Sequence, residues 1–150
     1  ISDPPLIIAD EPTTALDVTI QAQVLSLMRK LHRRNSGLLL ITHDMGVVSQ
    51  MATHIAVMYA GQIVEQAEAA AFFARPLHPY SAALLEAMPS SATRGTRLKA
   101  IPGQVPSAGS FPSGCRFHDR CPVARPACAE NAPALAPAGD RLVRCPYALP

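Results

Sequence analysis

Apolar and polar positions change their spacing along the first half of the chain, and each change predicts an element. Leu6 to Ala9 is a short continuous apolar run, typical of a strand that is covered on both faces. From Val18 to Arg34 the apolar residues recur at helical spacing and define one face, made of Ile20, Val24, Leu27, Met28 and Leu31. Leu38 to Ile41 is a second apolar run. The order strand, helix, strand predicts a parallel sheet with a crossover helix.

Turn-forming and capping residues give the limits of these elements. Asp17 is expected to cap the N-terminus of the helix, and Asn35 to Gly37 to end it, with Gly37 in a left-handed conformation. A short helix is expected over Met45 to Met51. The segment HIAVMYAGQIVEQ predicts two strands around a tight turn at Ala60-Gly61. The fold class is therefore expected to be α/β.

Composition changes near residue 75 and predicts a second region. The chain has 150 residues, of which 49% are hydrophobic, and this is enough for one ordinary domain with a core. Three of the 15 prolines lie before Arg75 and twelve after it, while all four cysteines lie in the last 36 residues. We expect an α/β region at residues 1–74 and a small irregular, cysteine-rich extension at 75–150. The Pro/Ala-rich stretch 129–139 is expected to be irregular.

Charge and apolar run length exclude some classes of protein. The net charge of +2 is too small to indicate binding to nucleic acid, and no apolar run approaches the length of a membrane span. The chain begins with Ile1 and enters a strand within six residues, so we expect a piece of something longer.

Acidic residues follow the first predicted strand, and a histidine follows the second. The carboxyl ends of neighbouring parallel strands form the edge at which open α/β sheets bind ligands. Two adjacent carboxylates there are costly unless they meet a cation or take part in a reaction. Asp10 could hold Mg²⁺, Glu11 could orient or deprotonate a water that attacks a phosphate, and His43 could contact the same phosphate.

These residues stand in two motifs of a known family. LIIADEPTTALD resembles the Walker B motif and D-loop of ATP-binding-cassette ATPases, and LLLITHD resembles their H-loop. The resemblance implies the C-terminal part of a P-loop NTPase sheet with ATP and Mg²⁺ as cofactors. It implies that Asp10 supports Mg²⁺ and that Glu11 is the catalytic base. It also implies that Asp17 lies in a loop at the interface between two ATPase subunits and that His43 contacts the γ-phosphate.

The second half of the chain carries a further resemblance. RPLHPYSAALLEAMP, followed by the cysteine-rich segment, is similar to the C-terminal extension of the oligopeptide, dipeptide and nickel importer ATPases. The His-Pro-Tyr signature of that extension is here His78, Pro79 and Tyr80. Proline suits the first turn of a helix, so we expect His78-Pro79 to start one and the triplet to be structural.

The resemblance covers essentially the whole chain and implies an assembly. The protein would be a peripheral subunit on the cytoplasmic face of the bacterial cytoplasmic membrane. Its partners would be two membrane-spanning permease subunits, a second ATPase subunit like or unlike itself and, indirectly, an extracytoplasmic substrate-binding protein, with no nucleic acid. Import of peptides or a related substrate such as nickel is the implied function.

Several parts of such an ATPase are missing from this sequence. The chain contains no Gly-Lys pair and hence no Gly-rich phosphate loop. The family's Leu-Ser-Gly-Gly-Gln signature and the loop whose Gln senses the membrane subunit are also absent, and in the family all of these precede Walker B. We therefore expect the full-length protein to be a transport-coupled ATPase and this chain alone to be inactive.

The four cysteines suggest a metal site. Disulfides do not usually persist in the cytosol, so we interpret Cys115, Cys121, Cys128 and Cys145 as four thiolate ligands. The zinc knuckle Cys-x-x-Cys is absent, whereas Cys-Pro pairs occur in some iron–sulfur ligand runs. The family's extension has a similar cysteine pattern, which implies a [4Fe–4S] cluster. Zn²⁺, disulfides and unliganded thiols remain alternatives.

The residues around the cysteines add two expectations. Four arginines lie next to or near the cysteines and are expected to favour thiolates and offset a cluster's charge, namely Arg116, Arg120, Arg125 and Arg144. The loops contain few large apolar residues, so the segment is expected to need the metal as a staple.

Two other functions compete with the importer ATPase. One is a truncated, non-catalytic metal-binding module. The other is an ATPase of the same superfamily that serves DNA repair or chromosome organisation. The cysteine-rich tail, the His-Pro-Tyr segment and the absence of a basic patch argue against the latter.

Overall fold

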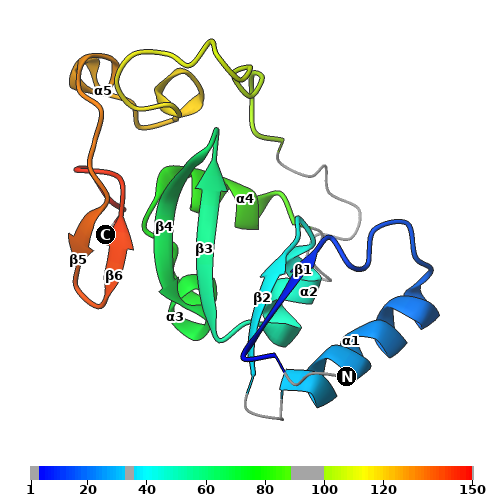
Figure 1. Cartoon of the computed structure of the whole chain (residues 1–150). Helices are drawn as coiled ribbons and strands as arrows, with labels where there is room; N and C mark the ends of the chain where they lie inside the picture. Colours follow the sequence, from blue (N-terminus) through cyan, green and yellow to red (C-terminus); the bar gives the residue numbers. More distant parts are fainter. Residues whose placement is uncertain (1–3, 33–35, 89–99, 150) are drawn as a thin grey trace. The chain divides into compact units, whose positions relative to one another are not determined.

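The computed structural model describes residues 4–32, 36–88 and 100–149, and the chain forms two compact units, Ile1–Ala52 and Thr53–Pro150 (Figure 1). The expected mixed α/β class is confirmed. The division of the chain at residue 75 stays a prediction, because it was drawn from composition, whereas the two units are defined by contacts. Residue 75 lies inside the second compact unit.

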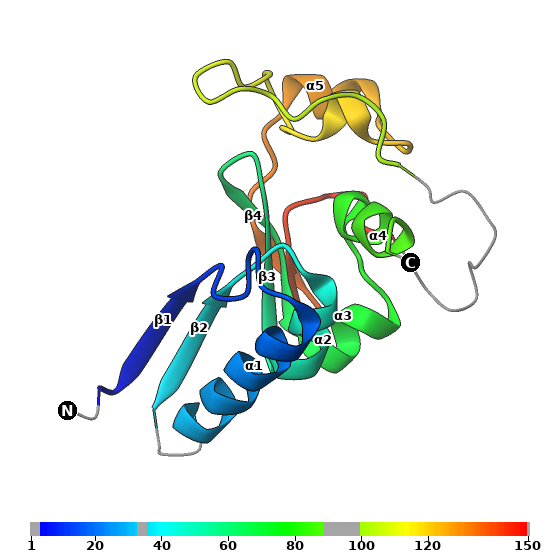
Figure 2. The ribbon, with the colours of Figure 1, turned by 90° about the vertical axis from the view of Figure 1, so that its right-hand side faces the viewer.

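The first unit is a strand pair with helices. Its elements are β1 (Leu6–Asp10), α1 (Val18–His32), β2 (Gly37–Ile41) and α2 (Met45–Met51). β1 and β2 pair in parallel, with Leu6 opposite Gly37 and Asp10 opposite Ile41. α1 connects the two strands and lies alongside them (Figure 2). The pairing brings the carboxyl ends of both strands to one edge.

The core of this unit overlaps only in part with the predicted face of α1, since Met28 and Val24 contribute to it whereas Ile20, Leu27 and Leu31 are exposed. Leu25 and Met28 of α1 are buried with Val47 of α2, whereas Leu27 is 57% exposed. Partly buried side chains pack against this core, namely Ala9, Val24, Leu38, Leu40 and Met51. Apolar residues occur on more than one side of α1, so periodicity alone could not decide which stripe faces the strands. Within the described chain the other face of the strand pair is exposed, at Leu6, Ile8, Leu39 and Ile41.

The predicted role of Gly37 is wrong. Gly37 is the first residue of β2, its N–H donates to the Pro5 carbonyl at 2.8 Å, and it is absent from the glycines with positive φ. The pairing with β1 imposes an extended backbone at this position. Residues 33–35, where the helix was expected to end, lie outside the described residues.

The second unit starts with the predicted hairpin. β3 (His54–Tyr59) and β4 (Gln62–Glu68) are antiparallel, and the turn residues Ala60 and Gly61 have φ of 46° and 77°. Positive φ at both turn residues matches the right-handed twist of the strands. The register shifts after Val57, which is opposite Glu65, because Met58 is opposite Ile63. Val64 is therefore the extra residue of a β-bulge.

The cysteine-rich extension contains regular structure and joins this sheet. Its elements and those before it are α3 (Ala69–Ala74), α4 (Pro79–Glu86), η2 (His118–Arg120), α5 (Pro126–Glu130), β5 (Ala136–Ala138) and β6 (Arg141–Val143). The strand order is β3-β4-β6-β5. The expectation of an irregular stretch over 129–139 is wrong at both ends, because it begins in α5 and finishes with β5. These short strands form because β6 pairs with β4. The local sequence carries no signal for this pairing.

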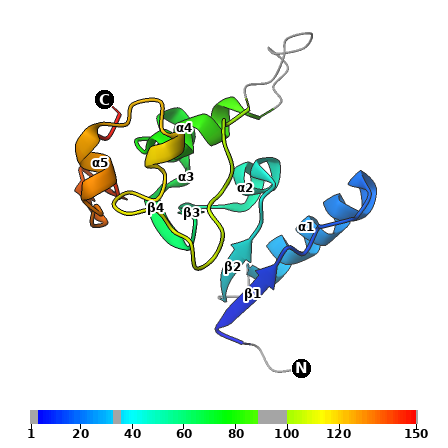
Figure 3. The same cartoon turned by 90° about the horizontal axis from the view of Figure 1, so that it is seen from above.

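η2 and α5 lie beyond the tip of the β3–β4 hairpin, as Figures 1 and 2 show, and Figure 3 gives the same elements in a view from above. The core of the unit takes side chains from both sides of residue 75, including Tyr59, Phe72, Phe117 and Val143. None of the described helices is both long enough and apolar enough to span a membrane.

Candidate functional site

The acidic pair and His43 lie together at the carboxyl ends of β1 and β2. Asp10 is the last residue of β1, and the Glu11 N–H extends the ladder by donating to the Ile41 carbonyl at 2.8 Å. Glu11 then turns out of the strand with φ of 44°, a left-handed conformation that is uncommon for a residue other than glycine. The expected meeting of these side chains at one edge is seen for Glu11 and His43.

Glu11 has a partner on each carboxylate oxygen. His43 Nδ1 lies 3.0 Å from Oε1, and the Thr14 hydroxyl donates to Oε2 at 2.8 Å. The hydrogen bond with His43 lowers the pKa of Glu11, and the bond from Thr14 lowers it further. The carboxylate is therefore ionised at neutral pH, as a proton acceptor must be. His43 is 74% exposed, so it is the partner with room to move.

Thr14 was missed in the sequence. Thr14 lies in the turn after β1, where its N–H donates to the Glu11 carbonyl at 3.1 Å. This turn brings the Thr14 hydroxyl back to the Glu11 carboxylate. A threonine three residues after an acid in a Pro-containing turn is the local signal that could have found it.

Asp17 and Asp44 fix the two helices beside this edge. Asp17 Oδ1 accepts from the N–H groups of Thr19 at 2.9 Å and Ile20 at 3.0 Å, so the predicted N-cap of α1 is confirmed. Asp44 caps α2 in the same way, and Gln21 of α1 donates to its other oxygen at 3.2 Å. His43 is thus held immediately before a capped helix. The roles of Asp10 toward Mg²⁺ and of Asp17 at a subunit interface stay predictions.

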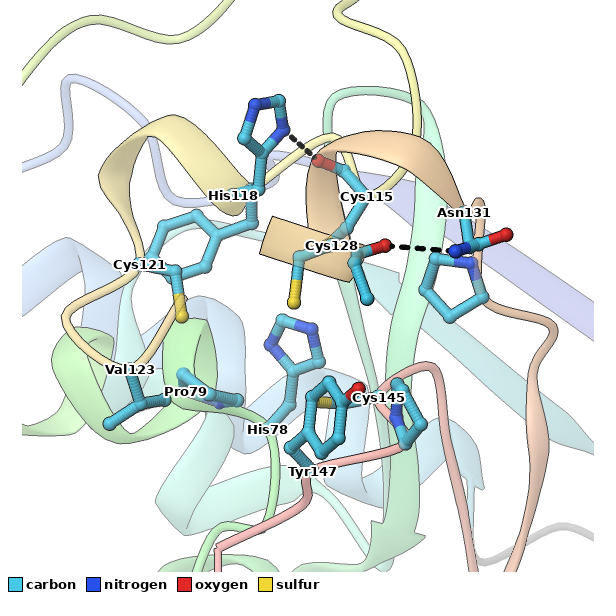
Figure 4. A pocket seen from close by; sticks show the side chains of 14 residues that line it. His78, Pro79, Cys115, His118, Cys121, Val123, Cys128, Asn131, Cys145 and Tyr147 are labelled. Carbon is cyan, nitrogen blue, oxygen red and sulfur yellow. Dashed lines mark hydrogen bonds between the residues drawn. The ribbon is translucent and has the colours of Figure 1, made fainter. Parts of the chain in front are cut away.

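A second candidate site lies in the other unit, where the four cysteines line one cavity of about 120 Å³. We call this the cysteine pocket: Cys115, Cys121, Cys128 and Cys145, with His78 and Tyr147 beside them (Figure 4). All four thiols are free. Among the described residues, no three His, Cys, Asp or Glu side chains are arranged as a group that could hold a metal ion. The cysteines therefore share a cavity without forming a finished metal centre.

Burial governs the acidity of the thiols. It raises the pKa of Cys115, Cys121 and Cys145, and the other cysteines raise these pKa values further, while backbone hydrogen bonds act in the opposite direction. The contribution of the neighbouring cysteines is the repulsion that a thiolate meets from other thiolates that line the same cavity. A cation among them would relieve it.

The arginines near the cysteines mostly serve another purpose than the predicted one. Arg125 lies over the Tyr147 ring at 3.9 Å and acts on the Cys145 thiol, where it opposes the effects of burial and of the neighbouring cysteines on the pKa. The guanidinium groups of the other three are instead hydrogen-bonded to backbone carbonyls, namely those of Arg116, Arg120 and Arg144. They fasten the chain, and the expectation that they would favour thiolates is not met for them.

His78 begins α4, as predicted. It is 1% exposed, its Nδ1 accepts from the Tyr80 N–H at 3.0 Å, and Pro79 is the first helical residue. Burial lowers the pKa of His78 to about 4, against a hydrogen bond with the Arg144 backbone that acts in the other direction. The neutral ring can accept at Nδ1 because its proton is then on Nε2. The expected structural role of the triplet agrees with this cap.

Glu65 in β4 was not singled out in the sequence. It is completely buried, and its two oxygens accept from the N–H groups of Leu77 and His78, each at 2.9 Å. Arg141 of β6 lies 3.8 Å from the same carboxylate. The sequence sets Glu65 apart by no signal, because β4 also contains the polar residues Gln62, Gln66 and Glu68.

Comparison with known proteins gives one family match and relatives that are similar over most of the chain. Residues 64–128 match the family described as the C-terminal region of oligopeptide/dipeptide transporters. The chain is therefore similar to this C-terminal region and, over most of its length, to part of the ATP-binding proteins of such transporters.

Two relatives show how far the similarity extends. The oligopeptide transport ATP-binding protein AppD of Bacillus subtilis is 52% identical over 145 residues, which are 95% of this chain and 44% of AppD. The dipeptide transport ATP-binding protein DppD of Escherichia coli is 49% identical over 148 residues, which are 97% of this chain and 45% of DppD. The chain thus spans less than half the length of these relatives.

Proposed function

We propose that this chain is part of the ATP-hydrolysing subunit of an importer for peptides, or for a related substrate such as nickel. The observation that carries the proposal is the hydrogen bond between Glu11 and His43 at the carboxyl edge of a parallel strand pair. The names of the relatives, which are peptide transport ATP-binding proteins, support it. They do not favour a metal-only module or a DNA-repair ATPase.

The proposal gives each residue a role. Asp10, an exposed carboxylate at the end of β1, supports Mg²⁺, which prefers oxygen ligands and shields phosphate charge. Glu11 accepts a proton from the attacking water, and this requires one of its oxygens to lose a partner. His43 can leave Oε1 and turn toward the γ-phosphate, which frees that oxygen while Thr14 keeps the carboxylate oriented. Asp17 lies in the loop at the interface with a second ATPase subunit.

The proposed assembly follows the family. The subunit works on the cytoplasmic face of the cytoplasmic membrane with two permease subunits and a second ATPase subunit, like or unlike itself. An extracytoplasmic binding protein acts indirectly, and no nucleic acid is involved.

The test is made on the protein encoded by the complete reading frame. Glu11→Gln keeps the shape of the side chain and removes its basicity, so ATP hydrolysis should fall about 100-fold or more while nucleotide binding is retained. Glu68→Gln, at an exposed glutamate, is the matched control and should hydrolyse at the normal rate. The 150-residue chain alone should show no turnover. Normal hydrolysis by Glu11→Gln would remove Glu11 as the base.

The cysteine pocket is proposed to hold a [4Fe–4S] cluster, with Zn²⁺ as the alternative. The fit lies in the donor set: four free thiols line one cavity, and burial, with a smaller contribution from the neighbouring cysteines, raises the pKa of three of them. Cys115, Cys121, Cys128 and Cys145 would be the ligands, and the group would cross-link four segments of the tail. Protein purified without oxygen should be brown and contain iron and acid-labile sulfide in roughly equal amounts. A colourless protein with zinc would favour the alternative.

A further inference from the structure

Three arginines of the extension reach one short stretch of chain, the tip of the β3–β4 hairpin (residues 59–63), which we call the hairpin tip. Arg116 donates to the Ala60 carbonyl. Arg120 Nη1 donates to the Tyr59 hydroxyl at 3.2 Å, and Arg144 Nε donates to the Ile63 carbonyl at 2.7 Å. All these groups belong to the second compact unit.

Each of these arginines is adjacent in sequence to a cysteine of the pocket. Arg116 follows Cys115, Arg120 precedes Cys121, and Arg144 precedes Cys145. Consecutive Cα atoms are about 3.8 Å apart, so an arginine fixed at its guanidinium and its backbone also limits where its neighbour can lie. The hairpin tip therefore constrains three of the four cysteines.

The fourth cysteine is fixed through the first. The Cys115 N–H donates to the Cys128 carbonyl at 2.8 Å, and the Ser113 hydroxyl donates to the Ala129 carbonyl at 2.9 Å. Gly114, with φ of 67°, makes this approach possible, since a Cβ there would lie 2.3 Å from the Cys128 oxygen. Cys128 and α5 are thus attached to Cys115.

Each of the same three arginines also makes a second contact, with a segment outside the hairpin tip. Arg120 Nε also donates to the Pro102 carbonyl at 2.7 Å, and Arg144 Nη1 to the Pro133 carbonyl at 3.1 Å. Arg116 lies over the Phe111 ring at 3.8 Å. None of these contacts involves a sulfur atom, so none of them requires a bond between a cysteine and a metal.

We propose that the hairpin tip is a template that holds the cysteines around the pocket before any metal arrives, with Arg116, Arg120 and Arg144 as positioning residues. This inference deepens the proposed metal site and rests on it only for the identity of the final ligand. It replaces the expectation that the extension depends on the metal as its staple. The ligands are gathered by arginines, and the metal fills a pocket that already exists.

Arginine suits this task because its planar fork donates in several fixed directions at once. A lysine keeps the charge but presents a single flexible ammonium group, which cannot contact two groups that lie apart, as each of these arginines does. Arg→Lys variants therefore separate the geometric role from an electrostatic one, because the charge near each thiol is preserved.

The experiment uses the full 150-residue chain, stripped of metal under reducing conditions. Each cysteine is alkylated with N-ethylmaleimide, and its rate is followed by mass spectrometry of peptides. In the wild type all four cysteines should react more slowly than in the urea-unfolded chain. Arg116→Lys, Arg120→Lys and Arg144→Lys should each accelerate the adjacent cysteine most, by about tenfold, which corresponds to the loss of a charged hydrogen bond.

The matched control is Arg125→Lys. Arg125 is also in the extension, but its guanidinium lies over Tyr147, away from the hairpin tip. Its substitution should leave the alkylation rates of Cys115 and Cys121 unchanged. Circular dichroism of every variant separates local loosening from global unfolding, and a variant that unfolds is replaced by Gly61→Ala. Gly61 has φ of 77°, and a Cβ there would lie 3.3 Å from Arg116 Nη1, so this change should accelerate Cys115.

Two results would overturn the template. One is a metal-free wild type whose cysteines react as fast as those of the unfolded chain. The other is a set of Arg→Lys variants with wild-type rates, or with equal acceleration at all four cysteines. Metal content is measured separately, on protein purified without oxygen. Protein that binds neither iron nor zinc but shows the site-specific acceleration would support the template and refute the proposed metal site.

Discussion

At the scale of single residues, the buried histidine His78 links the fold to pH. His78 caps α4 with Nδ1, and this contact needs the neutral ring, because a protonated Nδ1 donates. Its pKa of about 4 in the folded unit lies below its ordinary value of 6.5. At pH values between these two pKa values, the unfolded chain binds a proton at His78 that the folded unit does not bind.

Stability should therefore depend on pH through His78. The free energy of unfolding should be highest above pH 6.5 and fall as the pH drops from 6.5 toward 4. A difference of this size corresponds to roughly 3 kcal/mol, since one pKa unit is about 1.4 kcal/mol. Urea denaturation of the metal-free chain at pH 7 and pH 4.5 measures it.

His78→Asn is the control for this prediction. Asparagine can place an oxygen where Nδ1 accepts, so it keeps the cap and removes the titrating group. Its stability should vary less between the two pH values than that of the wild type. Equal losses in both proteins would assign the pH dependence to other groups.

The meeting of two side chains was predictable where motifs stand at strand ends and not where only the fold brings the partners together. Glu11 and His43 belong to motifs, and their separation of 32 positions is closed by a parallel strand pair that the pattern also predicted. Glu65 and Arg144 carry no motif. Their partners come from segments far away in sequence, so their roles become visible only when β6 is seen beside β4.

At the scale of elements, β4 connects the hairpin to the turn before α4 and to β6. The Glu65 carboxylate accepts two backbone N–H groups from the turn before α4 and faces Arg141 of β6. It thus joins three segments at a point that water does not reach. A buried carboxylate of this kind is costly to disturb because its partners are left without bonds.

Glu65→Gln should destabilise the second unit by about 3 kcal/mol, because an amide NH₂ would face one of the two N–H donors and the charge opposite Arg141 would be lost. Glu68→Gln, three positions along the same strand and exposed, should change stability by about 0.5 kcal/mol or less. Chemical denaturation of both variants makes the comparison. Similar losses in the two would show that the Glu65 carboxylate contributes little.

Elements were predictable in proportion to how local their cause is. The hairpin and α2 follow from nearby residues, and the structure has them where the pattern placed them. β5 and β6 have three residues each, too few for a periodic signal, and they form because β4 offers a free edge. Gly37 was misplaced for the same reason, since its extended backbone is imposed by pairing with β1.

On the scale of the whole molecule, the two compact units indicate which shorter pieces of the chain should fold when they are produced alone. The second unit includes the β3–β4 hairpin, and the cysteine-rich extension depends on that hairpin for β6, for Glu65 and for the arginine contacts. A piece that begins after α3 would lose all three.

Residues 53–150 produced alone should therefore fold cooperatively, whereas residues 75–150 should not. The shorter piece lacks the strand against which β6 pairs and the hairpin tip that gathers the cysteines. Dispersion of amide signals in NMR spectra distinguishes the two outcomes. A well-dispersed spectrum from 75–150 would mean that the extension is an independent domain, as the change in composition predicted.

The β-bulge at Val64 limits how this protein can change in length. Because one strand carries a residue that has no counterpart, Val64 can turn its carbonyl to the Arg144 N–H at 2.8 Å while Glu65, next to it, is also buried. Deleting one residue here would move every later side chain of β4 to the opposite face. We therefore expect relatives to differ in length in the exposed loop around Gly109 and to keep the spacing from Gly61 to Glu65 constant.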